Sequence, residues 1–580
     1  MCGIIGILGS TPVADQMVDA LKRLEYRGYD SAGVATLESG QLTRRRAEGK
    51  LKNLEQRLAR APLAGTIGIG HTRWATHGRV NETNAHPHAT DRVAVVHNGI
   101  IENFRELREE LEAKGAKFAT ETDTEVVAHL VAAEMKNGHA PVDAVAAALP
   151  RLRGAFALVF MFEGEEDLLV GARKGPPLAV GYGEGEMFLG SDAIALAPFT
   201  DAVSYLDDGD WVVVHRDGAQ VHDAKGHLVN RNIIKSSASA FLVDKGNHRH
   251  FMAKEIHEQP EVVGHTLAHC LDMVAESVAL PVKLPFDWRK LERVSISACG
   301  TAYYAGLVAK YWFERFARLP VEIDIASEFR YREAPLRKGD LAIFVSQSGE
   351  TADTLASLRY ARQHNQHVLS VVNVPTSTIA RESDVVMPTL AGPEIGVAST
   401  KAFTCQLAAL ASLAVAAGRA RGVLSDVDEK RIVHALIEVP RHLAEALTLE
   451  PQITELARDL AKCRHVLYLG RGTSYPIALI DETMPVVVIA PHDQIFEKTV
   501  SNMEEVAARG GRLVLVTDAE GARTAANSKP WVTLTLPTMP ATVAPLVYAV
   551  PVQLIAYHTA VIMGTDVDQP RNLAKSVTVE

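Results

Sequence analysis

The second residue of the chain is a cysteine that could act as a nucleophile and carry its own base. The chain begins Met1-Cys2-Gly3-Ile4-Ile5-Gly6, and removal of Met1 would leave a thiol and a free α-amine on Cys2. An unperturbed α-amine titrates at about 7.7–8.0, so it could take the thiol proton without a separate catalytic histidine. An isolated cysteine in an apolar run is more often a small core residue. The residues around Cys2 must therefore decide between these interpretations.

Polar residues downstream supply the groups that an amidase acting on glutamine needs. Such an enzyme needs a cation for the α-carboxylate, an anion for the α-amine, and donors for the oxyanion of the tetrahedral intermediate. Arg73 can clamp a carboxylate with two hydrogen bonds, and Asp123 can supply the anion. The Asn98 side chain and the Gly99 N–H can form the oxyanion hole. Each also has a structural alternative, namely a surface charge, a helix start or a hairpin turn. Together they provide every required role.

The segment from Cys2 to Asp123 resembles the glutamine amidotransferase domain of the N-terminal-nucleophile class. The run Tyr26-Arg27-Gly28-Tyr29-Asp30-Ser31-Ala32-Gly33, with the stretch through Trp74, narrows this to the glucosamine-6-phosphate synthase family, the isomerising glutamine–fructose-6-phosphate aminotransferases. The resemblance implies that Cys2 is nucleophile and base and that Asn98 and Gly99 hold the oxyanion. It also implies that Trp74 lies near the route by which ammonia leaves. The glutamine-binding residues that it implies are Arg73, Trp74, Thr76, His77, His86 and Asp123.

The composition is that of an ordinary multidomain soluble protein. A chain of 580 residues suggests three or four domains. The net charge of −10, without a basic block, argues against nucleic acid as a partner. The five cysteines include no Cys-x-x-Cys pair, which argues against a disulfide framework and a zinc ribbon. The start lacks the charged and apolar regions of a signal peptide. We expect a cytoplasmic enzyme without a metal or another cofactor.

Two apolar stretches have to be distinguished from membrane spans. The stretch from Ala541 to Gly564 is interrupted by Pro545 and Pro551, which favours a buried helix beginning near Pro551. The stretch from Cys405 to Gly418 is too short to span a bilayer and is typical of a core helix. The sequence therefore predicts no contact with a membrane.

The residue patterns predict an α/β and α+β multidomain chain. Short β-rich runs outnumber helical patterns up to residue 215, which favours layered sheets covered by helices. The resemblance implies that this glutaminase domain has the αββα layers of the N-terminal-nucleophile class. Broken, charged sequence follows and suggests a linker. The expected parts are a glutamine amidotransferase domain (2–215), a linker (216–250), a first sugar isomerase or SIS domain (251–440), a shortened second SIS domain (441–565) and a C-terminal tail (566–580).

An internal repeat fills the second half of the chain. An apolar strand runs into a Gly-Thr turn and a helix from Val294 to Thr301, and the same pattern recurs from Val466 to Ser474. Such a strand and turn are typical of a parallel α/β sheet that binds its ligand at the carboxyl edge of the strands. The sequence therefore predicts two doubly wound parallel domains of one type, and the family resemblance implies a homodimer formed through them.

A hydroxyl-rich turn in the first copy predicts a phosphate site. The strand from Leu341 ends in Ser346-Gln347-Ser348-Gly349-Glu350-Thr351, and a helix follows from about Ala352. Hydroxyls and free N–H groups at a helix N-terminus can bind an anion, although a helix cap is the simpler alternative. The turn resembles the signature of SIS domains, and the family resemblance implies that Lys575 forms a Schiff base with a ketose. The sugar-phosphate residues are predicted as Cys299, Gly300, Thr301, Ser346, Gln347, Ser348, Thr351, Val397 and Ser399.

The second copy of the repeat is about 27 residues shorter than the first. The interval compared is that from the glycine of the turn to the next strand, which runs from Gly300 to Leu341 in the first copy and from Gly472 to Val486 in the second. Acid–base residues of the family fall in this interval, and no residue here matches them. Three functions remain in competition: the complete amination and isomerisation of fructose 6-phosphate, a glutaminase that binds a sugar phosphate but isomerises poorly, and a phosphosugar-sensing regulator. The shortening favours little glucosamine 6-phosphate for the glutamine hydrolysed.

Overall fold

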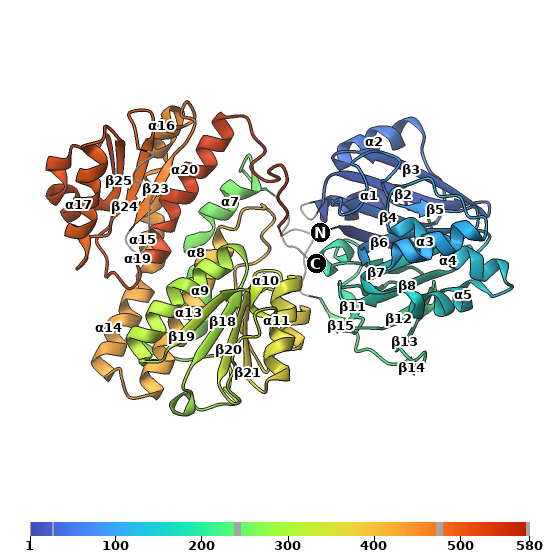
Figure 1. Cartoon of the computed structure of the whole chain (residues 1–580), viewed down its shortest axis with the longest axis horizontal. Coiled ribbons are helices and arrows are strands. Elements are labelled where there is room, and N and C mark those ends of the chain that lie inside the picture. The colour runs from blue at the N-terminus through green and yellow to red at the C-terminus, as the bar shows by residue number, and fades with distance from the viewer. Residues whose placement is uncertain (1, 26–27, 237–244, 471–479, 576–580) are drawn as a thin grey trace. The chain divides into compact units, whose positions relative to one another are not determined.

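A computed structural model describes residues 2–25, 28–236, 245–470 and 480–575. The chain divides into two compact units (Figure 1). The first comprises Met1–Asp244 with Ala574–Glu580, and the second comprises Lys245–Leu573. Each unit is described by itself below.

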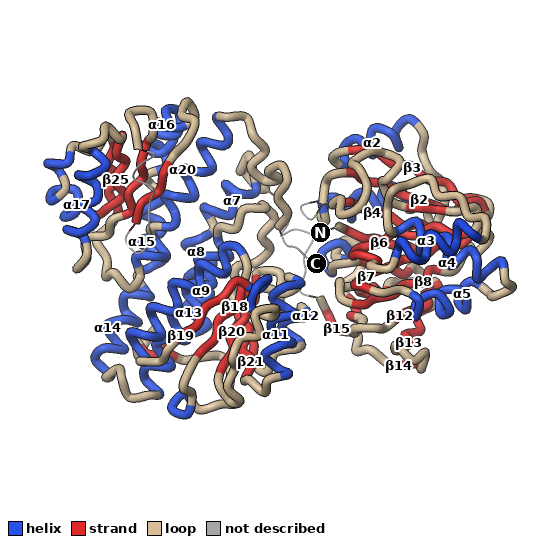
Figure 2. Tube along the Cα trace, in the orientation of Figure 1, coloured by secondary structure: helices blue, strands red, loops and turns tan. Residues whose placement is uncertain are grey.

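The described residues of the first unit form two sheets whose strands are red in Figure 2. All of their paired strands run antiparallel. In spatial order, the first sheet contains β15 (Ile234–Lys235), β11 (Ala202–Tyr205), β9 (Ala179–Tyr182), β10 (Met187–Gly190), β1 (Gly3–Leu8), β4 (Ile67–Arg73), β2 (Ser31–Glu38) and β3 (Gln41–Glu48). The second contains β14 (Leu228–Val229), β13 (Gly218–His222), β12 (Trp211–His215), β8 (Leu169–Lys174), β7 (Gly154–Phe162), β6 (Val93–Ile101) and β5 (His88–Ala89).

Alternating side chains build four layers from these sheets. In β1, Ile5 and Ile7 belong to the core beneath the helices, whereas Ile4 and Leu8 belong to the core between the sheets. Successive side chains of a strand point to opposite faces, so one fully apolar strand serves both cores. The first sheet is covered by α1 (Ala14–Lys22), α2 (Leu51–Arg60) and α6 (Ala193–Leu196), and the second by α3 (Phe104–Ala113), α4 (Thr124–Lys136) and α5 (Pro141–Ala148). This confirms the predicted αββα architecture.

The linker begins later than the sequence suggests. Residues 218–222 form β13, which pairs with β12, and residues 234–235 form β15, which pairs with β11. The segment from 216 to 236 therefore belongs to the first unit. Its residues have the composition of a loop, but they form short strands at or next to a sheet edge, with much of their surface in water. The remainder of the predicted linker includes 237–244, which lie outside the described residues.

The second unit contains two parallel sheets, as predicted. The first sheet has the spatial order β19 (Val321–Ile325), β18 (Val294–Ala298), β20 (Leu341–Ser346), β21 (His367–Val372) and β22 (Val385–Pro388). Helices cover both faces: α9 (Gly300–Trp312) and α13 (Lys401–Ala420) share one core, and α11 (Ala352–Gln363) and α12 (Thr378–Arg381) share the other. The central strands β20 and β21 are near-continuous apolar runs because both of their faces are buried.

The second parallel sheet is shorter. Its described strands are β23 (Leu467–Gly470), β24 (Pro485–Ile489), β25 (Arg512–Asp518) and β26 (Val532–Leu536), in that spatial order. One face packs on α17 (Phe496–Ala507). The other face packs on α16 (Glu450–Leu460), α19 (Ala544–Val547) and α20 (Ala549–Ile562). The repeated turn at Gly472 falls in 471–479, outside the described residues.

The second unit also contains α7 (Phe251–His257), α8 (Gln259–Cys270), α14 (Asp426–Ile437), α15 (Val439–Leu447), the short helices α10 (Ala326–Phe329) and α18 (Ala519–Thr524), and an antiparallel pair of short strands, β16 (Leu271–Asp272) and β17 (Ser277–Val278). Its large core takes in residues of both parallel sheets. Two helical stretches, Lys401–Ala420 and Ala544–Ile562, are long and apolar enough by length and composition to cross a membrane. The first is 89% buried, which supports its prediction as a core helix. The second is 44% buried, so the predicted buried helix is covered only in part, by its packing against α16 and in the same core.

Candidate functional site

Cys2 lies at the start of β1, beside the end of β4. The main-chain N–H of Trp74 donates to the Cys2 Sγ at 3.1 Å, and the thiol lies 3.4 Å from the Trp74 carbonyl oxygen. Burial raises the pKa of the Cys2 thiol, while the Trp74 hydrogen bond and the charge of Arg73 act in the opposite direction. A buried neutral thiol needs a base to become a nucleophile. A free α-amine on the same residue would be such a base.

Asn98 and Gly99 lie on β6, in the other sheet, and reach Cys2 across the layers. The Asn98 Nδ2 donates to the Cys2 carbonyl oxygen at 3.0 Å. Gly99 has a φ of +130°, and a Cβ there would lie 2.0 Å from the carbonyl oxygen of Ala155. Only glycine fits this backbone. The two proposed oxyanion donors therefore sit next to the nucleophile.

Arg73 is buried at the end of β4, and its guanidinium is held by the loop that follows. It donates to the carbonyl oxygens of His77 and Gly78, and to that of Arg79 at 3.4 Å. Burial lowers the pKa of Arg73, but an arginine stays charged across the physiological range. A buried fixed cation beside Cys2 is the arrangement expected for holding a carboxylate.

Asp123 stands immediately before α4, as the helix-start alternative predicted. Its side chain makes no cap hydrogen bond to that helix and instead accepts from the Ile101 N–H at 2.8 Å. The carboxylate oxygen also lies 3.9 Å from the Nδ1 of His97. The side chain is thus turned toward β6. Both of these contacts are made by the Oδ2 of Asp123, and the Oδ1 makes neither.

All nine residues predicted for the amidase line a single pocket of the first unit. They share it with His97, Thr122 and Thr124, which the sequence did not single out; the nine are Cys2, Arg73, Trp74, Thr76, His77, His86, Asn98, Gly99 and Asp123. The pocket brings together a nucleophile, a cation, an anion and amide donors. This set can bind an amino acid amide at both of its charged ends and attack its side-chain carbonyl.

A group of four buried histidines lies at the pocket: His86 and His97 line it, and His71 and His88 do not. His71 and His86 stack with ring centroids 4.1 Å apart, and His88 lies 4.5 Å from His86. Burial lowers the pKa of His71 to about 3, and it lowers the pKa values of His86, His88 and His97 as well. The four rings are therefore neutral at physiological pH. The dense spacing of histidines from 71 to 97 was the signal that could have found them.

The predicted sugar-phosphate residues of the first repeat lie at the carboxyl edge of the first parallel sheet. Cys299 caps α9 after β18, and Gly300 follows with a φ of +57°. Ser346 ends β20, and Thr351 precedes α11. Because β19 and β20 lie on opposite sides of β18, the strand order reverses between β18 and β20. Ligands of open α/β sheets bind at such switch points.

The turn after β20 is tightly organised. The hydroxyls of Ser346 and Thr351 lie 3.2 Å apart, and the Ser346 Oγ also accepts from the Gly349 N–H at 3.0 Å. The Ser348 Oγ accepts from the Glu350 N–H at 3.2 Å. Gly349 has a φ of +64°, and a Cβ there would lie 1.9 Å from the Ser377 Oγ. The hydroxyls thus shape their own loop, as a cap would, and they also line the switch point.

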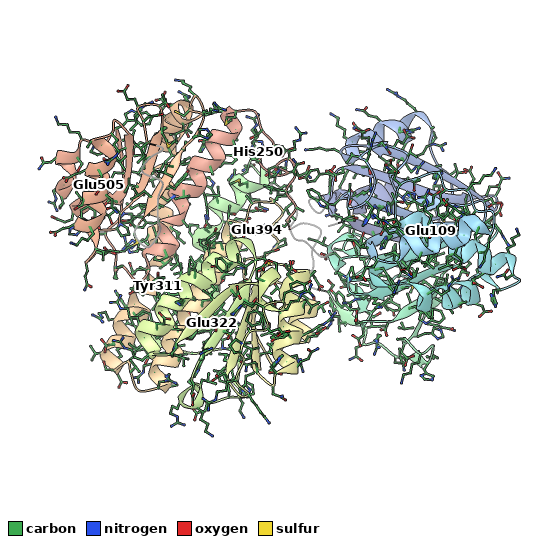
Figure 3. All side chains as sticks on the ribbon, in the orientation of Figure 1. Glu109, His250, Tyr311, Glu322, Glu394 and Glu505 are labelled. Carbon is green, nitrogen blue, oxygen red and sulfur yellow. The ribbon has the colours of Figure 1, made fainter. Side chains whose placement is uncertain are left out.

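Val397 and Ser399 lie on a loop that buried carboxylates hold in place. Glu394, labelled in Figure 3, accepts from the Ser399 Oγ at 3.1 Å and from the Thr400 N–H at 2.9 Å. The Val397 N–H donates to the carbonyl oxygen of Asp568 at 2.9 Å. The sequence does not single out Glu394, and Asp568 contributes to this loop through its main-chain oxygen rather than its carboxylate.

Lys575 belongs to the first unit by its contacts, whereas the turn after β20 belongs to the second. The Schiff base implied for Lys575 therefore stays a prediction. The second parallel sheet has no reversal of strand order among its described strands, because β23 to β26 follow one another in space. The switch-point geometry of the first sheet is thus not repeated in the described part of the second.

The fold and the site define a glutamine amidotransferase joined to sugar isomerase domains. A model of the glutamine amidotransferase domain matches residues 71–198, and one of the SIS domain matches residues 289–416 and 476–563. The chain is 69% identical to a glutamine–fructose-6-phosphate aminotransferase (isomerizing) of Bradyrhizobium diazoefficiens and 64% identical to one of Brucella suis biovar 1, with 100% of both chains covered. The chain belongs to the glutamine–fructose-6-phosphate aminotransferase (isomerizing) family.

A solved structure agrees with this assignment. The C-terminal domain of glucosamine-fructose-6-phosphate aminotransferase from Francisella tularensis matches with a TM-score of 0.54 and 37% sequence identity, and the match covers 56% of this chain and all of that one. The alignments with the two relatives run over 609 residues, whereas this chain has 580. The second SIS match begins at residue 476, downstream of β23.

Proposed function

We propose that this protein converts L-glutamine and D-fructose 6-phosphate into D-glucosamine 6-phosphate and L-glutamate. The observation that carries the proposal is the single pocket that contains Cys2, Arg73, Asn98, Gly99 and Asp123. Family membership over the whole chain supports the coupled reaction. The full-length match to relatives named as isomerizing also favours the complete reaction over an isolated glutaminase.

The first half-reaction follows from the pocket. The Cys2 sulfur attacks the side-chain carbonyl carbon of glutamine while its proton passes to the α-amine of Cys2 after removal of Met1. Asn98 and Gly99 stabilise the oxyanion that forms. The carbon–nitrogen bond then breaks, the proton is returned to the leaving ammonia, and water hydrolyses the thioester to glutamate. Arg73 and Asp123 hold the two charged groups of the amino acid.

The second half-reaction belongs to the SIS domains. The hydroxyls of Ser346, Ser348 and Thr351 hold the phosphate of fructose 6-phosphate at the switch point, and Lys575 binds its open-chain ketose. We propose domain bounds of 251–440, 441–565 and 566–580 and a homodimer formed through the SIS domains.

We also propose a cytoplasmic location, without nucleic-acid or membrane partners. The ordinary soluble composition supports the location, and the absence of a basic block supports the lack of a nucleic-acid partner.

Parallel measurement of both half-reactions tests the proposal. Purified protein should release glutamate from glutamine, and with fructose 6-phosphate it should also form the amino sugar. A matched reaction with Cys2→Ala should give neither product from glutamine. Glutamate release by Cys2→Ala at the rate of the parent protein would overturn the assignment of the nucleophile.

A further inference from the structure

The side-chain amide of Asn98 can serve an oxyanion in only one of its two orientations. An amide presents donors at its nitrogen and an acceptor at its oxygen, and a half-turn exchanges the two ends. In the structure the Nδ2 donates to the Cys2 carbonyl oxygen at 3.0 Å, while the Oδ1 lies 3.1 Å from the Nε2 of His71. In the reversed amide, the Oδ1 of Asn98 would face the carbonyl oxygen of Cys2. It would also repel the developing oxyanion, because both oxygens are acceptors.

His71 can act only as a donor at its Nε2. This nitrogen lies 2.9 Å from the main-chain carbonyl oxygen of His97, which can only accept a hydrogen bond. The hydrogen of the neutral ring must therefore be on Nε2, and the same N–H faces the Asn98 oxygen. Burial keeps the ring neutral by lowering the pKa of His71 to about 3. An amide NH₂ group turned toward His71 would meet this N–H and be repelled.

The His71 ring is itself held from several sides. Its residue lies on β4, where it pairs with Ile4 of β1 and Gly33 of β2. The ring stacks on His86 with an interplanar angle of 13°, and the His86 Nδ1 accepts from the His97 N–H at 3.3 Å. The ring therefore has a fixed position from which to direct the amide.

We propose that His71 is a positioning residue that holds the Asn98 amide with its nitrogen toward Cys2 and the oxyanion. His71 is not among the residues that line the pocket, so it acts through Asn98 rather than on glutamine. The inference rests on the proposed hydrolysis of glutamine. It goes beyond that proposal because it names the group that makes Asn98 a donor rather than an acceptor at the reacting carbonyl.

Kinetics of glutamine hydrolysis test this role. His71→Leu removes the N–H and should lower kcat about 10²-fold or more, the size of effect that loss of one oxyanion donor has. The KM for glutamine should change little, because the clamp at Arg73 and Asp123 stays. His71→Gln, which returns an N–H donor near the Nε2 position, should recover part of kcat. Asn98→Ala should lose about as much as His71→Leu.

A double variant and a chemical label separate positioning from general damage. His71→Leu in an Asn98→Ala background should cost little more, because the residue it positions is gone. Alkylation of Cys2 by iodoacetamide, followed on the N-terminal peptide, should keep its rate in His71→Leu, because displacement of iodide forms no oxyanion. The matched control His88→Leu removes a buried ring whose Nε2 lies 3.2 Å from the Thr122 hydroxyl instead, and it should lower kcat less.

The outcomes distinguish this inference from the function on which it rests. If the parent protein releases glutamate but His71→Leu keeps its kcat, the inference is wrong and the proposed function stands. The inference would also be wrong if the fold-losses in kcat of His71→Leu and Asn98→Ala multiplied in the double variant. It would be wrong as well if alkylation of Cys2 in His71→Leu slowed as much as kcat. If the parent protein releases no glutamate while Cys2 is intact and alkylated normally, the proposed function itself fails.

Discussion

The main-chain N–H of Trp74 donates to the Sγ of Cys2 at 3.1 Å. This contact joins the first strand of the chain to the residue that follows the end of β4. It places the thiol beside Arg73, within the pocket that also contains Asn98 and Asp123. The candidate nucleophile is therefore fixed by the antiparallel pairing of β1 with β4, in which Gly3 pairs with Thr72.

Replacement of Cys2 by alanine should abolish glutamine hydrolysis and leave the binding of fructose 6-phosphate unchanged. The two sites lie in different units of the chain, so loss of the Cys2 thiol should not change the structure of the turn after β20 or its binding of the sugar phosphate. Glutamate release and calorimetric binding of the sugar phosphate are the two measurements. Retention of Met1 should act like Cys2→Ala, because the α-amine of Cys2 is then part of a peptide bond.

A matched control exists for the thiol. Cys299 is a second partly exposed cysteine, and burial raises the pKa of its thiol. Cys299→Ala should keep glutamate release near that of the parent protein. Hydrolysis that survives in Cys2→Ala but is lost in Cys299→Ala would show that the nucleophile has been misplaced.

Replacement of Ser348 and Thr351 by alanine should weaken the binding of fructose 6-phosphate. Each charge-assisted hydrogen bond that is lost should cost about 1.5–3 kcal/mol. Calorimetry with fructose 6-phosphate and with fructose measures the effect, and the unphosphorylated sugar should bind far more weakly to the parent protein. Ser425→Ala is the matched control, because Ser425 caps α14 and accepts from the Asp428 N–H. Equal affinity for both sugars would exclude a phosphate site at this turn.

Much of the first unit could be predicted because its chemistry depends on residue types at fixed positions. Cys2, Arg73, Asn98, Gly99 and Asp123 were chosen from the roles that glutamine hydrolysis requires, and they line one pocket. The two layers that meet at β1 follow from its fully apolar sequence, because successive side chains point into opposite cores. The spacing of histidines from 71 to 97 marks the histidine group, but not its neutral state, because a neutral buried histidine and a surface histidine look alike in a sequence until the partners of each nitrogen are known.

The sheets of the second unit could be predicted for a different reason. Strands buried on both faces form near-continuous apolar runs, and β20 (Leu-Ala-Ile-Phe-Val-Ser) and β24 (Pro-Val-Val-Val-Ile) are of this kind. The end of the first unit is predicted less well, because β13 is a short strand next to the sheet edge and its composition resembles a loop. Glu394 was missed because its role depends on main-chain N–H groups of its own loop, which leave no mark on the sequence.

Replacement of the clamp residues should raise the KM for glutamine more than it lowers kcat. Asp123→Asn keeps the shape and an acceptor for the Ile101 N–H but removes the negative charge. Arg73→Lys keeps the charge but loses the two-pronged geometry. A loss of about 1.5–3 kcal/mol corresponds to roughly 10- to 150-fold in KM. Initial rates over a range of glutamine concentrations measure it. The exposed neighbour Arg79 supplies the control variant Arg79→Lys, which should leave KM nearly unchanged; an equal rise there would contradict the clamp.

Acid should destabilise the first unit before the second. The pKa of His71 falls from 6.5 to about 3 on folding, because the ring is buried. Between these values the unfolded chain binds more protons, so this contribution to the free energy of unfolding is present above pH 6.5 and is lost progressively toward pH 3. The slope reaches about 1.4 kcal/mol per pH unit for each such histidine. Burial lowers the pKa values of His86, His88 and His97 in the same direction.

Hydrogen exchange, corrected for the pH dependence of the intrinsic rate, measures this difference. Protection in β4 and β6 should fall more between pH 7.5 and pH 5 than protection in β20 and β21. Replacement of His71 by glutamine removes one titrating ring and should flatten the dependence in β4. Equal loss of protection in both units would contradict the prediction.

The most direct measurement follows the amide nitrogen of glutamine into the sugar. The protein is supplied with glutamine labelled with ¹⁵N at the amide and with saturating fructose 6-phosphate, and glutamate and amino sugar are quantified in the same sample. We expect close to one ¹⁵N-labelled glucosamine 6-phosphate for each glutamate formed, and neither product with Cys2→Ala. Glutamate that accumulates without labelled amino sugar would contradict the coupled reaction, and it would favour the alternative of a glutaminase that isomerises poorly.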